Sequence, residues 1–186
     1  MIEFFINGQS VDVQLEGEQT IGDVLHSFEQ TCEENAAAVI GITIDGQKVT
    51  AEVFDDFSAR QLGKNTKFEF SVVTQNDIKN SFKKLSELFE SLASQMQNVP
   101  MALQNNKNVE VSESIKTLAD SIDQFCHIAT LASLFPETFT KTTLNGMTFK
   151  EFFEDFSPIL KDFENALQNN DSVMIGDLSE YEICPR

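Results

Sequence analysis

The sequence predicts an α+β protein in which a small sheet with one helix, residues 1–74, precedes a small antiparallel helical bundle, residues 75–186. In the first part apolar residues alternate with polar ones, which is the pattern of half-buried strands. After Asp77 they recur every three or four residues, which is the pattern of amphipathic helices. Six of the eight glycines also lie before residue 75. These changes indicate two domains.

The first segment reads as a β-hairpin followed by a helix. Apolar residues alternate from Ile2 to Ile6, and Asn7-Gly8 is a strong signal for a tight hairpin turn. The alternation resumes from Val11 to Leu15. Thr20 stands three residues before Asp23, an acidic variant of the capping box, and therefore predicts the start of a helix.

A second hairpin and a last strand complete this part. The apolar, β-branched run 39–44 ends at Asp45-Gly46, and residues 47–49 form a short return strand. Phe68, Phe70 and Val72 then alternate with polar residues. The predicted order is two strands, a helix, and at least two further strands.

These residues resemble the β-grasp, or ubiquitin-like, family, and in particular the small sulfur-carrier proteins of thiamin and molybdopterin synthesis. The resemblance rests on the patterns 6–15, 19–25 and 44–47, and it covers residues 1–74 only. The carriers act through a free C-terminal Gly-Gly. Here the last strand runs through Val73 and Thr74 into a helix, so the resemblance implies a binding or scaffolding module without carrier chemistry.

Two amphipathic helices are predicted next. The first has an apolar stripe from Ile78 to Met96, and either Thr74 or Asn76 is expected to cap it. Pro100 and the polar residues 104–108 interrupt the pattern. A second apolar stripe, from Ile115 to Ala129, predicts the second helix.

A third helix is rich in phenylalanine. Thr148 and Glu151 form a capping box at its start. Its apolar face contains Phe149, Phe152, Phe153, Phe156, Leu160 and Phe163. Pro158 predicts either a kink or a new segment that begins there. A last short helix is expected near residues 173–183. The phenylalanine face favours core packing, with a groove for a partner helix as the alternative.

Charge and cysteine content restrict the partners. The formal net charge is −17, so an anionic nucleic acid or membrane surface would be repelled, and a protein is the expected partner. The first residues do not resemble a signal peptide, and no segment resembles a membrane helix. The odd number of widely spaced cysteines fits reduced thiols, which predicts a cytoplasmic location. They are Cys32, Cys126 and Cys184.

No catalytic residue, cofactor site or metal site is predicted. Cys126-His127 has no second pair of ligands, which a structural zinc site needs. No phosphate-binding loop or nucleophile motif is present in the sequence. Neighbouring acids, such as Glu154-Asp155, leave a carboxylate-based enzyme as an alternative, although surface acids are far more common.

The candidate partner-binding residues are Phe5, Val39 and Val73. If Phe4 and Ile6 face the helix, Phe5 must face the other side of the sheet, because side chains alternate along a strand. Val73 joins it there, and so does Val39 if its strand keeps the same phase. This face would be covered either by the helical domain or by a protein partner.

These observations favour a non-enzymatic cytosolic adaptor or regulatory protein that binds a protein partner. The alternative is a chaperone-like protein that shields an amphipathic segment of a secreted or flagellar client. Binding through the first domain would favour the adaptor, and binding through the helical domain would favour the chaperone.

Overall fold

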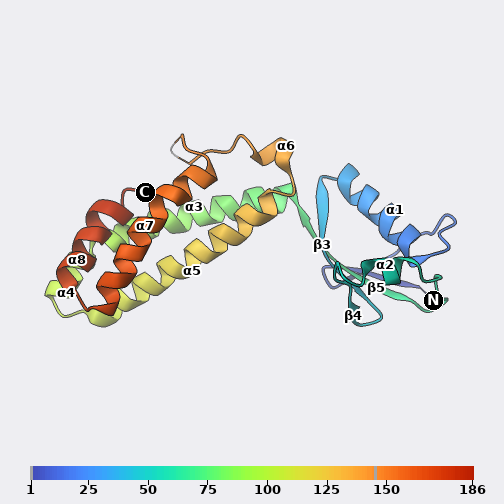
Figure 1. Cartoon of the computed structure of the whole chain (residues 1–186), viewed down its shortest axis with the longest axis horizontal. Helices are drawn as coiled ribbons and strands as arrows, with labels where there is room; N and C mark the ends of the chain where they lie inside the picture. The colour runs from blue at the N-terminus through green and yellow to red at the C-terminus, as the bar shows by residue number, and fades with distance from the viewer. Residues whose placement is uncertain (1, 145) are drawn as a thin grey trace. The chain divides into compact units, whose positions relative to one another are not determined.

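The computed structural model describes residues 2–144 and 146–186, and the chain forms two compact units. The sheet unit ends at Asp77, and the helical unit begins at Ile78. The predicted α+β class is confirmed, because a five-stranded sheet precedes a helical region (Figure 1).

The sheet unit has the strand order β2-β1-β5-β3-β4, in which β1 and β5 are parallel and the other neighbours are antiparallel. Its elements are β1 (Glu3–Ile6), β2 (Gln9–Val11), α1 (Ile21–Glu34), β3 (Ala37–Ile44), β4 (Gln47–Lys48), α2 (Phe54–Ser58) and β5 (Lys67–Thr74). Both predicted hairpins, the helix and the last strand are therefore present, but the second strand of the first hairpin ends at Val11 and does not continue to Leu15 as predicted.

Local sequence explains these elements. Asn7 and Gly8 in the first hairpin turn have φ values of 50° and 81°, and Asp45 and Gly46 in the second have 49° and 79°. Tight hairpin turns require positive φ at both positions, which Asn, Asp and Gly adopt most readily. At the start of α1 the predicted capping box is complete, since the Thr20 side chain accepts from the N3 backbone N–H and the N3 carboxylate accepts from the Thr20 N–H.

The core of the sheet unit lies between α1 and one face of the sheet. Phe4 and Phe68 stack with ring centroids 5.1 Å apart and ring planes 7° apart. Phe70 stacks in the same way against Phe28 of α1 at 3.9 Å. Phe68 is 0% exposed, so the centre of this sheet face is covered.

The short helix α2 was not predicted from the sequence. It has five residues and no side-chain cap, and only Phe57 is buried. Such a helix carries too few periodic residues to be recognised from its pattern.

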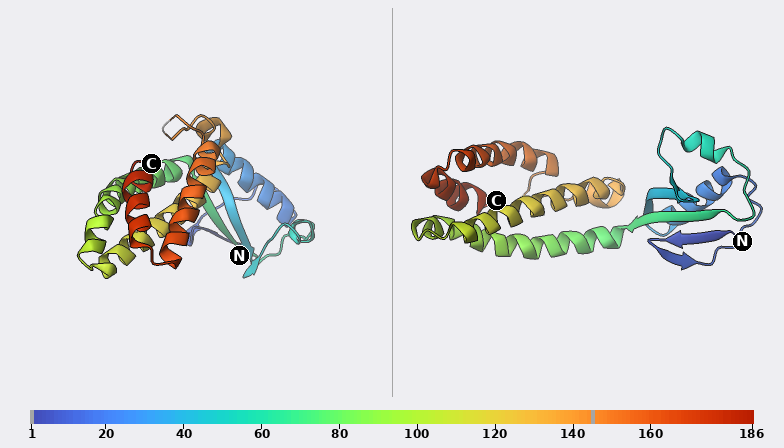
Figure 2. Two further views of the ribbon diagram at one scale, coloured as in Figure 1. Left: turned by 60° about the vertical axis from the view of Figure 1, so that its left-hand side comes forward. Right: turned by 90° about the horizontal axis from the view of Figure 1, so that it is seen from below.

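In the helical unit, α3 and α5 run antiparallel and lie side by side in Figures 1 and 2. The helices are α3 (Gln75–Gln97), α4 (Val99–Gln104), α5 (Asn108–Ala132), α6 (Pro136–Phe139), α7 (Phe149–Gln168), α8 (Ser172–Asp177) and the π-helical η1 (Leu178–Ile183). The predicted cap Thr74 is confirmed, because its Oγ1 accepts from the Asp77 N–H at 3.0 Å.

Prolines act differently in two of these helices. Pro100 lies in the first turn of α4, where the missing N–H costs nothing. Pro158 lies inside α7, which continues past it as one helix, so the predicted new segment at this residue is wrong. Within the described residues, no helix has both the length and the apolar character to cross a membrane.

Candidate functional site

An apolar groove of about 740 Å³ lies between α3, α5 and α7 of the helical unit, and residues 139–144 and 183–186 contribute to its lining. We call it the phenylalanine groove because eight phenylalanine side chains line it. Phe125 and Phe156 among them are buried, and the other six are half-buried. The half-buried ones are Phe82, Phe89, Phe139, Phe149, Phe152 and Phe153.

Phe125 of α5 is the centre of the ring contacts in this groove. Its centroid lies 5.4 Å from both Phe149 and Phe153 of α7, and 5.9 Å from Phe82 of α3. The rings are tilted or edge-on, which is a favourable aromatic arrangement. The rings around Phe125 are therefore packed against one another, although six of the eight groove phenylalanines remain half-buried.

Helical periodicity and capping place these side chains. On α3 the lining residues between Lys79 and Met96 recur at helical spacing, so they form one stripe. The capping box of α7 is complete, because Thr148 Oγ1 accepts from the Glu151 N–H at 3.3 Å and Glu151 Oε2 accepts from the Thr148 N–H at 2.8 Å. This cap fixes the first turns of α7, which carry three of the groove phenylalanines.

Charged groups lie at the margin of the groove. Arg186 lines it and donates from Nε to Asp155 Oδ2 at 3.1 Å and from Nη1 to Glu182 Oε2 at 2.9 Å. The hydrogen bond to Asp155 is the main cause that raises the pKa of Arg186. Lys79 and Glu90 of α3 are exposed at the groove.

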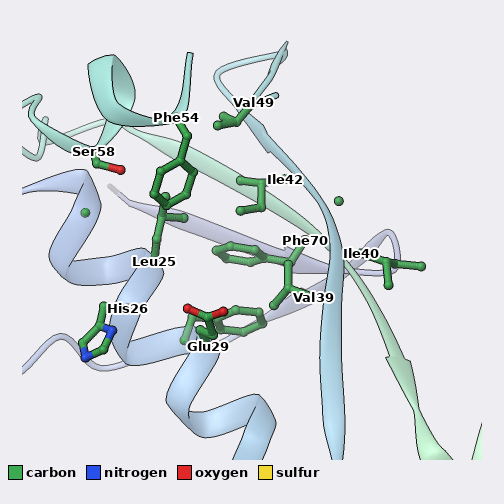
Figure 3. Close-up of a pocket in the computed structure, with 13 residues that line it drawn as sticks. Leu25, His26, Glu29, Val39, Ile40, Ile42, Val49, Phe54, Ser58 and Phe70 are labelled. Atoms are coloured by element: carbon green, nitrogen blue, oxygen red, sulfur yellow. The ribbon is translucent and has the colours of Figure 1, made fainter. Parts of the chain in front are cut away.

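The sheet unit has a separate cavity of about 520 Å³ between α1, α2 and β3 (Figure 3). We call it the edge cleft. Leu25, His26 and Glu29 line it from α1, and Val39 to Ile42 line it from β3. Figure 3 shows Val39 on the side of β3 that faces α1, whereas Ile40 points away. Sequence reasoning missed this cleft because it depends on the spacing between two elements.

The structure does not bring the three predicted partner-binding residues together. Val39 pairs with Val72 and packs against the core beneath α1, so its predicted place on the outer face is wrong. The reason is a β-bulge between Val39 and Gly41, which leaves Ile40 without a partner in the ladder. One extra residue shifts the phase of the preceding residues, so Val39 changes side.

The other two predicted residues are on the outer face but differ in exposure. Phe5 is half-buried, and the Lys67 Nζ lies 4.6 Å from its ring centroid. The Lys67 side chain therefore covers part of this ring. Lys67 also forms an ion pair with Glu69 at 2.7 Å. Val73 is only 8% exposed. A partner-binding role for Phe5 and Val73 remains a prediction.

The cysteines and histidines do not assemble a site in the described part of the chain. Cys126 and His127 are both exposed on α5. No group of three or more His, Cys, Asp or Glu side chains suited to a metal ion occurs among residues 2–144 and 146–186. Desolvation raises the pKa of the buried Cys32 thiol and that of the Cys126 thiol, and the nearby Asp123 carboxylate adds to the rise at Cys126.

The phenylalanine groove had only a partial signal in the sequence. The phenylalanine-rich pattern of α7 allowed both a core face and a groove, and the structure contains both. Phe156 and Phe163 are buried, while Phe149, Phe152 and Phe153 remain half-buried. Which phenylalanines stay accessible depends on neighbouring helices, and the pattern of one helix does not contain that information.

The fold and the groove define a two-unit α+β protein whose helical unit has an apolar groove. Residues 76–186, more than half of the chain, match the family model "Domain of unknown function (DUF8042)", and the chain belongs to this family. Residues 2–74 match the model "TP0873 N-terminal domain". An "Uncharacterized protein" of Treponema pallidum (strain Nichols) is 22% identical over 184 residues, 99% of this chain and 92% of the relative. No solved structure matches the chain.

Proposed function

We propose that this is a non-enzymatic protein-binding protein that holds an amphipathic helix of a protein partner in the phenylalanine groove. The observation that carries the proposal is the set of six half-buried phenylalanines along one groove. Exposed apolar surface gathered in one place is typical of an interaction site, because its burial is favourable. This placement favours the chaperone-like alternative, in which the helical unit shields a client segment.

The shape of the groove supports a helix as the occupant. Its lining on α3 extends from Lys79 to Met96, which is roughly 25 Å at about 1.5 Å per residue. Helices α3, α5 and α7 supply most of its lining residues. Three packed helices that leave an apolar groove offer the place that a fourth helix takes in a four-helix bundle. A helix binds such a groove through residues spaced three and four apart.

The adaptor is the second candidate, and it requires a binding site on the sheet unit as well. We propose that this unit is a ubiquitin-like β-grasp module. The order β2-β1-β5-β3-β4, the parallel central pair and the single long helix across one face support this proposal. The edge cleft gives the module a concave surface of its own. We also propose a cytoplasmic location, which the free thiols of Cys32, Cys126 and Cys184 support.

Photo-crosslinking tests the helix-binding proposal. The full chain would carry p-benzoylphenylalanine in place of Phe89 in the cells that naturally contain the protein. We expect a crosslink to a partner, mapped by mass spectrometry to an amphipathic helical segment. Ala93→Trp should remove the crosslink, because the indole would fill the groove beside Leu92 and Met96.

A matched control separates groove filling from general damage. Ala119→Trp makes the same change at an exposed position of α5 outside the groove and should keep the crosslink. Circular dichroism would verify that both variants are folded. Crosslinks that persist in Ala93→Trp, or that map to extended segments, would contradict the proposal.

A further inference from the structure

One side of β3 is a free strand edge beside the edge cleft. The strand pairs with β5 from Ala37 to Ile44, whereas β4 pairs with Thr43 and Ile44 only. The Val49 N–H extends this side by one bond to the Ile42 carbonyl. In the part of the chain that the structure describes, no strand lies beside residues 37–41 on the side away from β5. Such an edge presents backbone donors and acceptors to an incoming strand.

The sequence of this edge does little to prevent pairing. Residues 37–41 read Ala-Ala-Val-Ile-Gly and contain no charged residue and no proline, which are common protections of strand edges. Ile40 is 47% exposed at the bulge. The bulge changes the local twist but leaves this apolar side chain accessible.

The edge cleft is placed to receive side chains from a strand added at this edge. Gly22, Leu25, His26 and Glu29 line it from one face of α1. Figure 3 shows the last three of these residues. An added strand would lie about 4.8 Å from β3, and alternate side chains would point toward α1. Ser58 also lines the cleft, and its buried Oγ has no hydrogen-bond partner among the described residues.

Charge further restricts the occupant. Helix α1 carries four acidic residues and no lysine or arginine. The carboxylate of Glu29 lies beside the cleft between α1 and β3 (Figure 3). A segment with lysine or arginine near Glu29 would be attracted, and an acidic segment would be repelled.

We propose that the edge cleft binds an extended segment of a protein partner, which pairs with residues 37–41 of β3 as a sixth strand. Its apolar residues recur every second position and enter the cleft, and a basic residue lies near Glu29. This mode of recognition combines backbone hydrogen bonds with pockets for alternate side chains. It uses the sheet unit and is independent of the phenylalanine groove.

The experiment begins with selection of 12-residue peptides from a displayed random library on the immobilised full chain. The peptides are then measured by fluorescence polarisation. We expect a selected peptide with alternating apolar residues and at least one lysine or arginine. Its affinity should fall at least tenfold in Glu29→Lys. It should change little in Glu34→Lys, the same change on α1 outside the cleft.

Backbone methylation of the peptide tests strand addition without altering the protein. N-methylation at every second residue should weaken binding at least tenfold, and methylation at the intervening residues should have little effect. Binding should also persist in full-length Ala93→Trp, which separates this site from the phenylalanine groove. Selection of no such peptide, equal tolerance of all methylated positions, or full affinity in Glu29→Lys would overturn the proposal.

Discussion

The phenylalanines of the sheet core and those of the phenylalanine groove differ in how far they are covered. In the sheet unit, Phe4, Phe68 and Phe70 stack nearly parallel and are at most 4% exposed, because α1 covers the sheet face. In the helical unit, six phenylalanines of one groove stay half-buried around Phe125. The same residue type therefore closes a core in one unit and lines an open groove in the other. The difference depends on whether another element covers the rings.

The largest expected effect comes from truncating one phenylalanine in each unit. Phe68→Ala should lower the free energy of unfolding of the sheet unit by about 3–5 kcal/mol, because a fully buried ring leaves a cavity. Phe153→Ala should cost roughly 1–2 kcal/mol, because the half-buried ring removes less surface from water. Urea unfolding followed by circular dichroism measures both. Equal costs would mean that the groove is packed as tightly as the core.

Glycine substitutions sharpen the comparison. A Cβ at Gly22 would lie 2.9 Å from the Ser58 backbone oxygen, so Gly22→Ala should destabilise the sheet unit by about 1–3 kcal/mol. A Cβ at Gly176 would meet Pro100 at an ordinary 3.4 Å, so Gly176→Ala in α8 should be neutral or stabilising by about 0.4–1 kcal/mol. Thermal unfolding measures both changes, and a Gly22→Ala variant as stable as the unchanged chain would contradict the close approach at Gly22.

The smallest expected effect is the pH dependence of stability that comes from two helix caps, one at the start of α1 and one at the start of α7. Hydrogen bonds from the Thr20 backbone lower the pKa of Asp23, and those from the Thr148 backbone lower the pKa of Glu151. A lowered folded-state pKa gives stability that is present above the unfolded-state pKa and is lost as pH falls through the folded-state value. Asp23→Asn and Glu151→Gln should therefore lower the melting temperature at pH 7 and have less effect in acid.

Melting curves at neutral pH and in acid below the ordinary carboxyl pKa range would check this prediction. Asp12→Asn is the control, because it removes the same charge at an exposed position just after β2. If Asp23→Asn lowered the melting temperature equally at both pH values, the carboxylate charge at the cap would not contribute to stability.

Local patterns in the sequence were sufficient for most of the fold. The Asn7-Gly8 and Asp45-Gly46 turns, the Thr20 cap and the Thr148 cap are encoded within four or fewer consecutive residues, and all were predicted. The bulge at Ile40 was missed because an extra residue in a ladder depends on the partner strand.

The candidate sites were less predictable than the elements. Phe149 and Phe153 were placed on the correct helix face, but their accessibility depends on the neighbours of α7. The edge cleft depends on the short length of β4, which pairs with only two residues of β3. A sequence pattern gives the side to which a residue points, but it does not give the distance to the next element.

Ile40 is one residue more than the ladder needs, since Val39 already pairs with Val72 and Gly41 with Ser71. Deleting Ile40 would make Val39 and Gly41 neighbours in the chain, as their partners Val72 and Ser71 already are. The residue pairs between β3 and β5 would therefore be kept on both sides of the deletion. Relatives that lack one residue at this position would therefore keep the same strand register between β3 and β5. They would differ in whether the free edge of β3 carries a bulge at the place where a partner strand would pair.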